Sequence, residues 1–289
     1  MDEPVLDETV VDASGATVGY YAYGDPEGRP VFALHGTPSC GAGFEWTDDA
    51  ARARGLRVLA PDRPGVGRSA QRRDWQVADY PVMLAALADA LDIDRFGVIG
   101  YSGGGPYAVA CAARLGDRLT GTAVCAGMGE IGTIATIADF ESTDRRLLTM
   151  AAKRPRLARA LLDLAAMAAT WSPKLAVKSF LKQLSPSDRD VVATFGSPAD
   201  AMRSFTQAFQ EGAHGVAADY RALGRAWGID LAEVMAPVSV WHGSADTMVP
   251  LRHSQELVAR LPDATLTVWA GEGHLATVTH IGEVLDSFG

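Results

Sequence analysis

The chain has 289 residues, of which 48% are hydrophobic and 21% are charged, a composition typical of soluble globular proteins. Its formal net charge of −9 argues against a nucleic-acid-binding surface. No apolar run approaches the length that a membrane span requires. The first residues, Met1–Glu8, are acidic and polar, unlike a signal peptide. We therefore expect a cytoplasmic protein that binds neither nucleic acid nor membrane.

Strands and helices are expected to alternate over the first 127 residues. Two β-rich runs, Thr9–Asp12 and Thr17–Tyr23, predict an N-terminal hairpin. Further along, short apolar runs predict buried strands and the stretches between them predict helices, which implies right-handed βαβ units and a parallel sheet. The strands are expected at Val31–Leu34, Leu56–Ala60, Phe96–Ile99 and Thr122–Cys125, and the helices near Phe44–Arg54, Trp75–Leu91 and Tyr107–Leu115.

This alternation stops after Gly127 and resumes near the C-terminus. Residues 128–235 are Ala-rich, contain no convincing strand and are interrupted by prolines, which predicts an inserted helical subdomain. The remaining core comprises residues 1–127 and 236–289, and the sequence predicts a doubly wound, mostly parallel α/β fold. Strands are expected at Val238–Trp241 and Thr265–Trp269, and helices at Leu251–Leu261 and near His274–Phe288.

The sequence Gly100-Tyr101-Ser102-Gly103-Gly104 has the form G-x-S-x-G between a predicted strand and a predicted helix. Because Gly100 and Gly104 have no Cβ atom, the strand and the helix can approach closely around a sharp turn. Such a turn forces the serine into an unfavourable backbone conformation and leaves it exposed to a substrate carbonyl. This context predicts a nucleophile elbow with Ser102 at its tip.

A serine nucleophile needs a base to take its proton and an acid to orient that base. Asp246 lies in a Gly-containing loop after one predicted strand, and His274 directly follows the last predicted strand. Both loops fall at the edge of the sheet where sites occur in open parallel sheets. We therefore expect a catalytic triad of Ser102, Asp246 and His274, whereas His35 and His242 are expected to have structural roles.

The oxyanion that forms during acyl transfer needs hydrogen-bond donors. One donor is expected to be the Gly103 N–H, which follows the nucleophile at the start of a helix. The second is expected from the loop after Leu34, where we assign the Thr37 N–H because Pro38 has none. The three cysteines have no metal-binding spacing.

These features together resemble the α/β-hydrolase fold over essentially the whole chain. The resemblance implies a serine esterase without metal or organic cofactor, with residues 128–235 as a helical cap and a glycine-rich loop that braces the site. Some members of the family place the acid after the preceding strand, which makes Glu130 the alternative to Asp246. The matching segments are His35-Gly36-Thr37-Pro38, Asp62-Arg63-Pro64-Gly65-Val66-Gly67-Arg68-Ser69, Gly100-Tyr101-Ser102-Gly103-Gly104, the Asp246 loop and Gly273-His274.

The resemblance implies hydrolysis of an apolar small-molecule ester, such as a secondary-metabolite methyl ester or lactone, through an acyl-enzyme on Ser102. Carbon–carbon bond hydrolysis and cofactor-free perhydrolysis are alternatives, although relatives with those activities commonly carry a Met where this chain has Gly103. A non-catalytic ligand-binding protein is a further alternative, against which the intact triad argues. The candidate residues of the substrate pocket are Tyr101, Cys40, Trp171 and Phe209.

Overall fold

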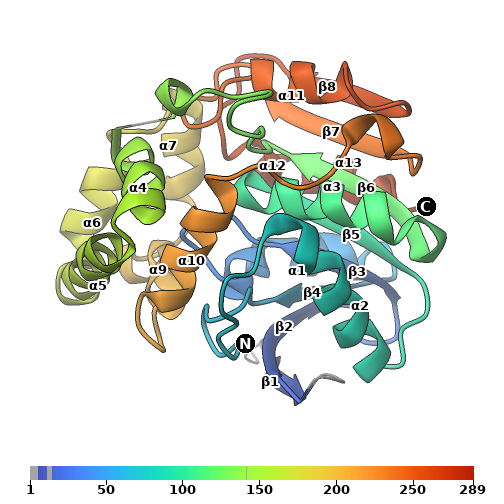
Figure 1. The fold of residues 1–289 in the computed structure, drawn as a ribbon, viewed down its shortest axis with the longest axis horizontal. Coiled ribbons are helices and arrows are strands. Elements are labelled where there is room, and N and C mark those ends of the chain that lie inside the picture. Colours follow the sequence, from blue (N-terminus) through green and yellow to red (C-terminus); the bar gives the residue numbers. More distant parts are fainter. Residues whose placement is uncertain (1–5, 12–14, 141) are drawn as a thin grey trace.

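An eight-stranded sheet forms the centre of the computed structural model, which describes residues 6–11, 15–140 and 142–289 (Figure 1). The strand order is β1-β2-β4-β3-β5-β6-β7-β8. β2 pairs antiparallel with β1 and with β4, and the other neighbours pair parallel, which confirms the mostly parallel sheet. Residues 12–14, at the turn of the predicted hairpin, lie outside the described residues. The strands are β1 (Leu6–Val11), β2 (Thr17–Gly24), β3 (Arg29–Leu34), β4 (Leu56–Pro61), β5 (Phe96–Tyr101), β6 (Leu119–Cys125), β7 (Val238–Gly243) and β8 (Ala264–Trp269).

Helices cover both faces of this sheet. Along β5, a Cβ atom on Gly97 would meet Phe288 at 2.4 Å, whereas a Cβ atom on Gly100 would meet Ala108 at 2.7 Å. Positions 97 and 100 point to opposite faces because side chains alternate along a strand. The C-terminal segment and α3 therefore cover opposite faces. The helices of the core are α1 (Asp48–Arg52), α2 (Tyr80–Ala90), α3 (Gly105–Arg114), α11 (Arg252–Val258), α12 (Ala276–Thr279) and α13 (Ile281–Asp286).

Seven α-helices of the described residues are inserted between β6 and β7 and gather at one side of the sheet (Figure 1). Four of them, α5 to α8, begin with a proline, which suits the first helical position because it has no N–H that needs an intrahelical partner. These are the prolines that interrupt the Ala-rich segment. The inserted helices are α4 (Ser142–Lys153), α5 (Pro155–Trp171), α6 (Pro173–Phe180), α7 (Pro186–Ala193), α8 (Pro198–Ala201), α9 (Arg203–Gln207) and α10 (His214–Leu223).

The register of the parallel strands brings four loops to one edge of the sheet. The last residue of β5, Tyr101, is aligned with Cys125 of β6, which is aligned with Trp241 of β7. Gly243 at the end of β7 is in turn aligned with Trp269 at the end of β8. The loops that carry Ser102, Glu130, Asp246 and His274 therefore all leave the sheet at the same edge.

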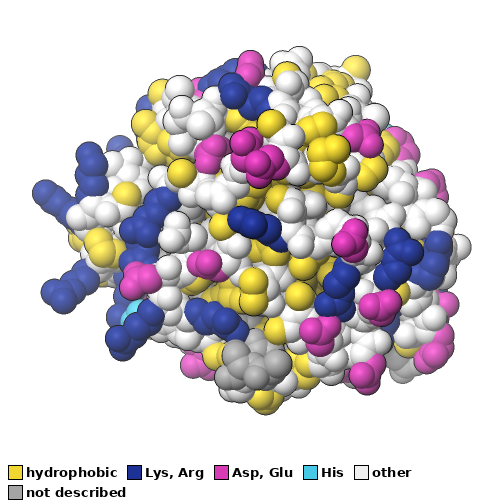
Figure 2. Space-filling model, turned by 45° about the vertical axis from the view of Figure 1, so that its right-hand side comes forward, with side chains coloured by type: hydrophobic (Ala, Val, Ile, Leu, Met, Phe, Trp, Pro, Cys, Tyr) yellow, Lys and Arg dark blue, Asp and Glu magenta, His cyan; other side chains and the backbone are white. Residues whose placement is uncertain are grey.

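The surface combines charged and apolar side chains, and Lys and Arg project on the side of the inserted helices (Figure 2). Among the described residues, no helix is both long enough and apolar enough to span a bilayer. Helices α5 and α6 nevertheless expose a group of large apolar side chains: Leu157, Leu161, Leu164, Met167, Trp171 and Leu175.

Candidate active site

Ser102 lies at a strained turn between β5 and α3. Its φ angle is +53°, in the left-handed region that side chains rarely adopt. A Cβ atom on Gly100 would lie 2.6 Å from the Gly104 carbonyl oxygen, and one on Gly104 would lie 2.0 Å from that of Leu34. The two glycines are therefore required for the close approach of strand and helix, as the G-x-S-x-G pattern predicts.

The structure brings Asp246 and His274 together. His274 Nδ1 lies 2.7 Å from Asp246 Oδ2, and both side chains are buried. The other carboxylate oxygen of Asp246 accepts the backbone N–H groups of Met248 (2.8 Å) and Val249 (2.9 Å). His242 Nε2 also lies 3.2 Å from Asp246 Oδ2, so this histidine supports the acid directly. The carboxylate is therefore fixed from both sides.

The ionisation of this pair follows from burial and from the neighbouring charges. Burial alone would lower the pKa of His274, but Asp246, and then the carboxylates of Asp188 and Asp144, outweigh it and raise that pKa. Burial alone would raise the pKa of Asp246, but His274 and the hydrogen bonds from His274 and His242 hold it well below its ordinary value. Asp246 is therefore ionised at neutral pH.

A pH dependence follows from the raised pKa of His274. Only the neutral imidazole can take a proton, so kcat/KM for a neutral ester should fall as the pH falls, with a midpoint above the ordinary value of 6.5. The raised pKa also means that the protonated ring stabilises the fold. This stabilisation is complete below pH 6.5 and is lost as the pH rises through the folded-state pKa of His274. Measurement of kcat/KM from pH 5 to 9 tests the expected pH dependence of activity, and a midpoint at or below pH 6.5 would contradict it.

The elbow and the His274 loop meet through Tyr101. Its hydroxyl donates to the His274 carbonyl oxygen at 3.2 Å, and the two ring centroids are 5.2 Å apart. Within the described residues there is no hydrogen bond between the Ser102 hydroxyl and His274. Such bonds are often long before substrate binds. The imidazole thus lies beside the elbow without being bonded to the serine.

The two expected oxyanion donors, Thr37 and Gly103, are neighbours. A Cβ atom on Gly103 would lie 3.2 Å from the Thr37 backbone nitrogen, and both residues line the same pocket as Ser102. Gly36 of the same loop lies next to the serine, because a Cβ atom on Gly36 would be 3.3 Å from Ser102 Cβ. The loop after β3 and the start of α3 therefore bring two backbone amides to the elbow.

Arg63, from the glycine-rich loop after β4, bonds to the loop after β3 that carries Thr37. Its buried guanidinium donates to the His35 carbonyl oxygen and to Thr37 Oγ1 (2.8 Å). It also pairs at 2.7 Å with Asp219 of α10, whose carboxylate accepts hydrogen bonds from the hydroxyls of Thr37 and Tyr107. Through Asp219 and Arg63, the inserted helix α10 is thereby held against the loop after β3.

Breaking this buried pair should be costly. Asp219→Ala leaves the Arg63 charge buried without its partner, so we expect the free energy of unfolding to fall by about 3–5 kcal/mol. Asp286→Ala is the matched control, because it breaks the exposed Arg54–Asp286 pair, and exposed ion pairs contribute little to stability. Urea denaturation of both variants measures the difference, and equal losses would contradict this role for Asp219.

A pocket opens at Ser102, beside the inserted helices α4 and α10. Most of its wall is apolar. Its polar part includes Asp144 of α4, whose carboxylate accepts the Tyr220 hydroxyl at 2.7 Å. The lining residues are Thr37, Ser102, Gly103, Met128, Phe140, Asp144, Leu148, Tyr220, Leu223, Met248 and Val249.

None of the four expected pocket residues is among these lining residues. Trp171 is 81% exposed at the end of α5, and Phe209 packs against Phe205 with ring centroids 5.0 Å apart. Cys40 is completely buried in the core, and Tyr101 contacts His274 instead. The wall of this pocket comes instead from α4, α10, the elbow and the loops after β3, β6 and β7.

Glu130, the alternative acid, is bonded elsewhere. Its carboxylate accepts the Trp227 backbone N–H and the Thr133 hydroxyl. Asp246 is the carboxylate that contacts the His274 ring.

Sequence reasoning missed the carboxylates that the inserted helices bring to this region. Asp188 of α7 accepts the backbone N–H groups of both His274 and Leu275. The segment Ser185-Pro186-Ser187-Asp188 resembles a capping box, so it predicts only the start of a helix. Nothing in the sequence links it to a loop 86 residues further on.

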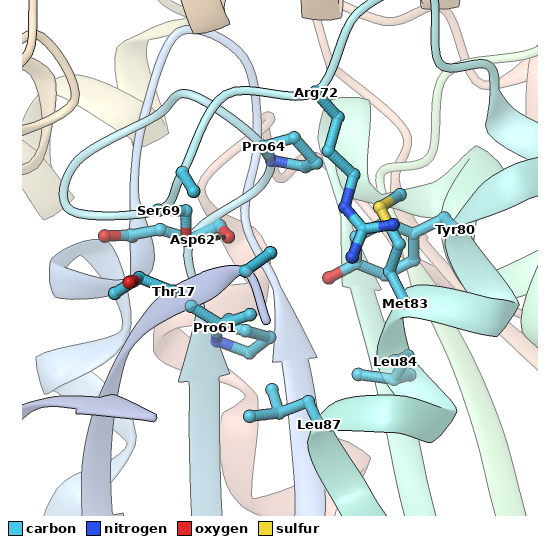
Figure 3. Close-up of a pocket in the computed structure, with 13 residues that line it drawn as sticks. Thr17, Pro61, Asp62, Pro64, Ser69, Arg72, Tyr80, Met83, Leu84 and Leu87 are labelled. Carbon is cyan, nitrogen blue, oxygen red and sulfur yellow. Dashed lines mark hydrogen bonds between the residues drawn. The ribbon is translucent and has the colours of Figure 1, made fainter. Parts of the chain in front are cut away.

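A second hollow lies away from these residues, between β2, the loop after β4, and α2 (Figure 3). Leu84 and Leu87 line one side, and Arg72 extends toward Tyr80 (Figure 3). In the same loop the Ser69 hydroxyl donates to the Asp62 carbonyl oxygen at 2.7 Å. No predicted site residue lines this hollow, so it is separate from the candidate active site.

A family model described as alpha/beta hydrolase fold matches residues 29–281. The chain therefore belongs to the alpha/beta hydrolase fold family. It is similar to 2-hydroxymuconate semialdehyde hydrolase of Pseudomonas putida, at 27% identity over 88% of this chain and 83% of that protein.

Two solved esterase structures share the fold. The esterase of Exiguobacterium antarcticum superposes with a TM-score of 0.70 at 15% identity, and the match covers 98% of this chain and 97% of the esterase chain. The esterase of Rhodococcus sp. ECU1013 superposes with a TM-score of 0.67 at 19% identity, and the match covers 99% of this chain and 100% of the esterase chain. At sequence identities this low, the structural similarity shows a shared fold and does not assign an activity.

Proposed function

We propose that this protein is a serine hydrolase that cleaves a carboxylic ester through an acyl-enzyme on Ser102. The observation that carries the proposal is the 2.7 Å contact of His274 with Asp246 at the edge of the sheet where Ser102 occupies a strained turn. A histidine oriented by a buried carboxylate is the arrangement that activates a serine.

The proposed reaction uses each group at a defined step. His274 donates its Nδ1–H to Asp246, which leaves Nε2 free to take the Ser102 proton as the hydroxyl attacks the ester carbonyl. The Thr37 and Gly103 amides stabilise the oxyanion. His274 then protonates the leaving alcohol and activates the water that hydrolyses the acyl-enzyme.

The pocket supports a small, largely apolar substrate. Phe140, Leu148, Leu223 and Met248 form an apolar wall beside the elbow, with the Asp144 carboxylate as a polar element. In this proposal residues 128–235 form a cap over the site, and the substrate is a neutral ester, of the kind found in methyl esters or lactones of secondary metabolites.

Carbon–carbon bond hydrolysis by the same residues is the second candidate. The observation that favours it is the similarity to 2-hydroxymuconate semialdehyde hydrolase along most of the chain. Gly103 after the serine argues for the ester, because relatives that cleave carbon–carbon bonds or form peracids commonly carry Met there. A binding protein without turnover is the remaining alternative.

A substrate panel tests the proposal. The purified protein is incubated with p-nitrophenyl esters of increasing acyl length, methyl esters, lactones and a vinylogous 1,5-diketone. We expect turnover of the esters, with an initial burst of p-nitrophenol wherever deacylation is slow. Turnover of the diketone alone would favour carbon–carbon hydrolysis, and ligand binding without any turnover would favour a binding protein.

A further inference from the structure

Asp188 lies on inserted helix α7 but directs its carboxylate into the loop that carries His274. Oδ2 accepts the His274 N–H at 3.1 Å, and Oδ1 accepts the Leu275 N–H at 2.7 Å. The Ser185 hydroxyl donates to Oδ2 at 2.8 Å. The side chain is completely buried. Both of its carboxylate oxygens therefore accept hydrogen bonds.

The His274 loop is shaped to receive this carboxylate. A Cβ atom on Gly273 would lie 2.2 Å from Asp188 Oδ2 and 2.1 Å from Ser185 Oγ. Such distances are far shorter than a van der Waals contact, so only glycine permits the approach. The residue before His274 thus has a steric requirement that comes from an inserted helix rather than from its own loop.

A second copy of the same motif shows that helix capping alone does not require these contacts. Ser197-Pro198-Ala199-Asp200 begins α8 as Ser185-Pro186-Ser187-Asp188 begins α7, and both form capping boxes. Asp200 is exposed, and among the described residues its carboxylate accepts hydrogen bonds only from Ser197, from the backbone N–H at 2.9 Å and from the hydroxyl at 2.7 Å. The bonds of Asp188 to His274 and Leu275 are therefore additional to capping.

We propose that Asp188 is a positioning residue of the active site, which fixes the backbone of His274 and places a second negative charge near its imidazole. This inference rests on the proposed function, in which His274 is the base. The groups that face or surround the imidazole are Asp246, with His242 behind it, Tyr101, Asp188 and, further away, Asp144.

The charges around Asp188 support an electrostatic effect on His274. Within the part of the chain that the structure describes, no Lys or Arg forms an ion pair with Asp188. After Asp246, Asp188 is the next carboxylate that raises the pKa of His274 against the effect of burial. Asp188 should therefore favour the imidazolium that forms when Ser102 attacks.

One consequence concerns how the inserted helices move. Leu275 packs with Leu184 and Val192 in a small apolar cluster that joins the α7 region to the His274 loop. Separating α7 from the core would break this cluster and release the backbone of His274. The position of the His274 backbone therefore depends on the packing of α7 against the core.

The test compares Asp188→Asn with Asp200→Asn, which makes the same change in the matched capping box. Asparagine at 188 presents an NH₂ group to one of the two backbone donors and removes the charge. We expect kcat to fall about 10- to 100-fold, because small displacements of a catalytic group have effects of that size. We also expect the acidic limb of the pH profile to move to lower pH, while Asp200→Asn matches the wild type in both respects.

Two further measurements separate this role from loss of stability and from failure of the proposed function. Thermal unfolding reports the loss of stability, which should be larger in Asp188→Asn because buried Asp188 also bonds to His274 and Leu275, and kcat is compared at a temperature at which both variants are folded. NMR titration of the His274 ring, assigned with His274→Gln, reports its pKa without any substrate. A lower pKa in Asp188→Asn alone would support the inference. A ring pKa and relative kcat equal to those of Asp200→Asn would overturn it. Absence of turnover in the wild type would count against the proposed function, while the titration would still test Asp188.

Discussion

Ser102→Ala is expected to lower kcat for ester hydrolysis by about 10⁶-fold, the size of effect seen when a triad nucleophile is removed. Alanine has no oxygen to form the acyl-enzyme, so the Asp246–His274 pair would have no nucleophile to activate. The smaller side chain also fits the strained turn as well as serine does. Stability should therefore change little, and progress curves at high enzyme concentration measure the residual rate.

Ser287→Ala is the matched control for this substitution. Its hydroxyl donates to the Val284 carbonyl oxygen at 2.6 Å, in α13, and it takes no part in the site. We expect this variant to retain the wild-type kcat. A loss of less than 10-fold in Ser102→Ala would mean that hydrolysis uses another nucleophile.

Asp246→Asn should have the next largest effect, a fall of about 10⁴-fold in kcat, as for loss of the orienting acid in other triads. The structure explains the direction. Oδ1 of Asp246 accepts the N–H groups of Met248 and Val249, so the asparagine carbonyl oxygen must occupy that position. Its NH₂ group then faces His274 Nδ1, which has to become an acceptor. The ring proton moves to Nε2, and the imidazole can no longer take the Ser102 proton.

Glu130→Gln is the control for Asp246→Asn, since Glu130 is the alternative acid. Its carboxylate is bonded to Trp227 and Thr133 rather than to His274. We expect kcat within about 10-fold of wild type for Glu130→Gln, against the roughly 10⁴-fold loss for Asp246→Asn. The reverse order of effects would assign the acid to Glu130. Steady-state assays of both folded variants, checked by circular dichroism, distinguish the two results.

The strands of the sheet could be predicted because the pattern that identifies each strand lies within a few consecutive residues. Strands buried on both faces are continuous apolar runs, and β5 and β6 begin and end within three residues of the predicted limits. The elbow and the Asp246 and His274 loops directly follow β5, β7 and β8. Once the strand order is parallel, their meeting at one edge follows from the register. Fold and candidate triad thus depend on short segments whose patterns are specific.

The pocket could not be predicted because it depends on contacts between distant segments. Trp171 has the side chain of a pocket residue, but the orientation of α5 leaves it exposed. Asp219 and Asp188 look like ordinary helix residues in the sequence. Their functions arise from contacts with Arg63 and with the His274 backbone, made across 156 and 86 residues of chain. No periodicity or local motif encodes such pairings.

In the proposed reaction, His274 activates Ser102 as the nucleophile. Incubation of the native protein with a fluorophosphonate, followed by intact-mass measurement and peptide mapping, tests it most directly. We expect one stoichiometric adduct on Ser102 in the wild type and none in His274→Ala. No adduct on the native wild-type protein, or an adduct on another residue, would contradict it.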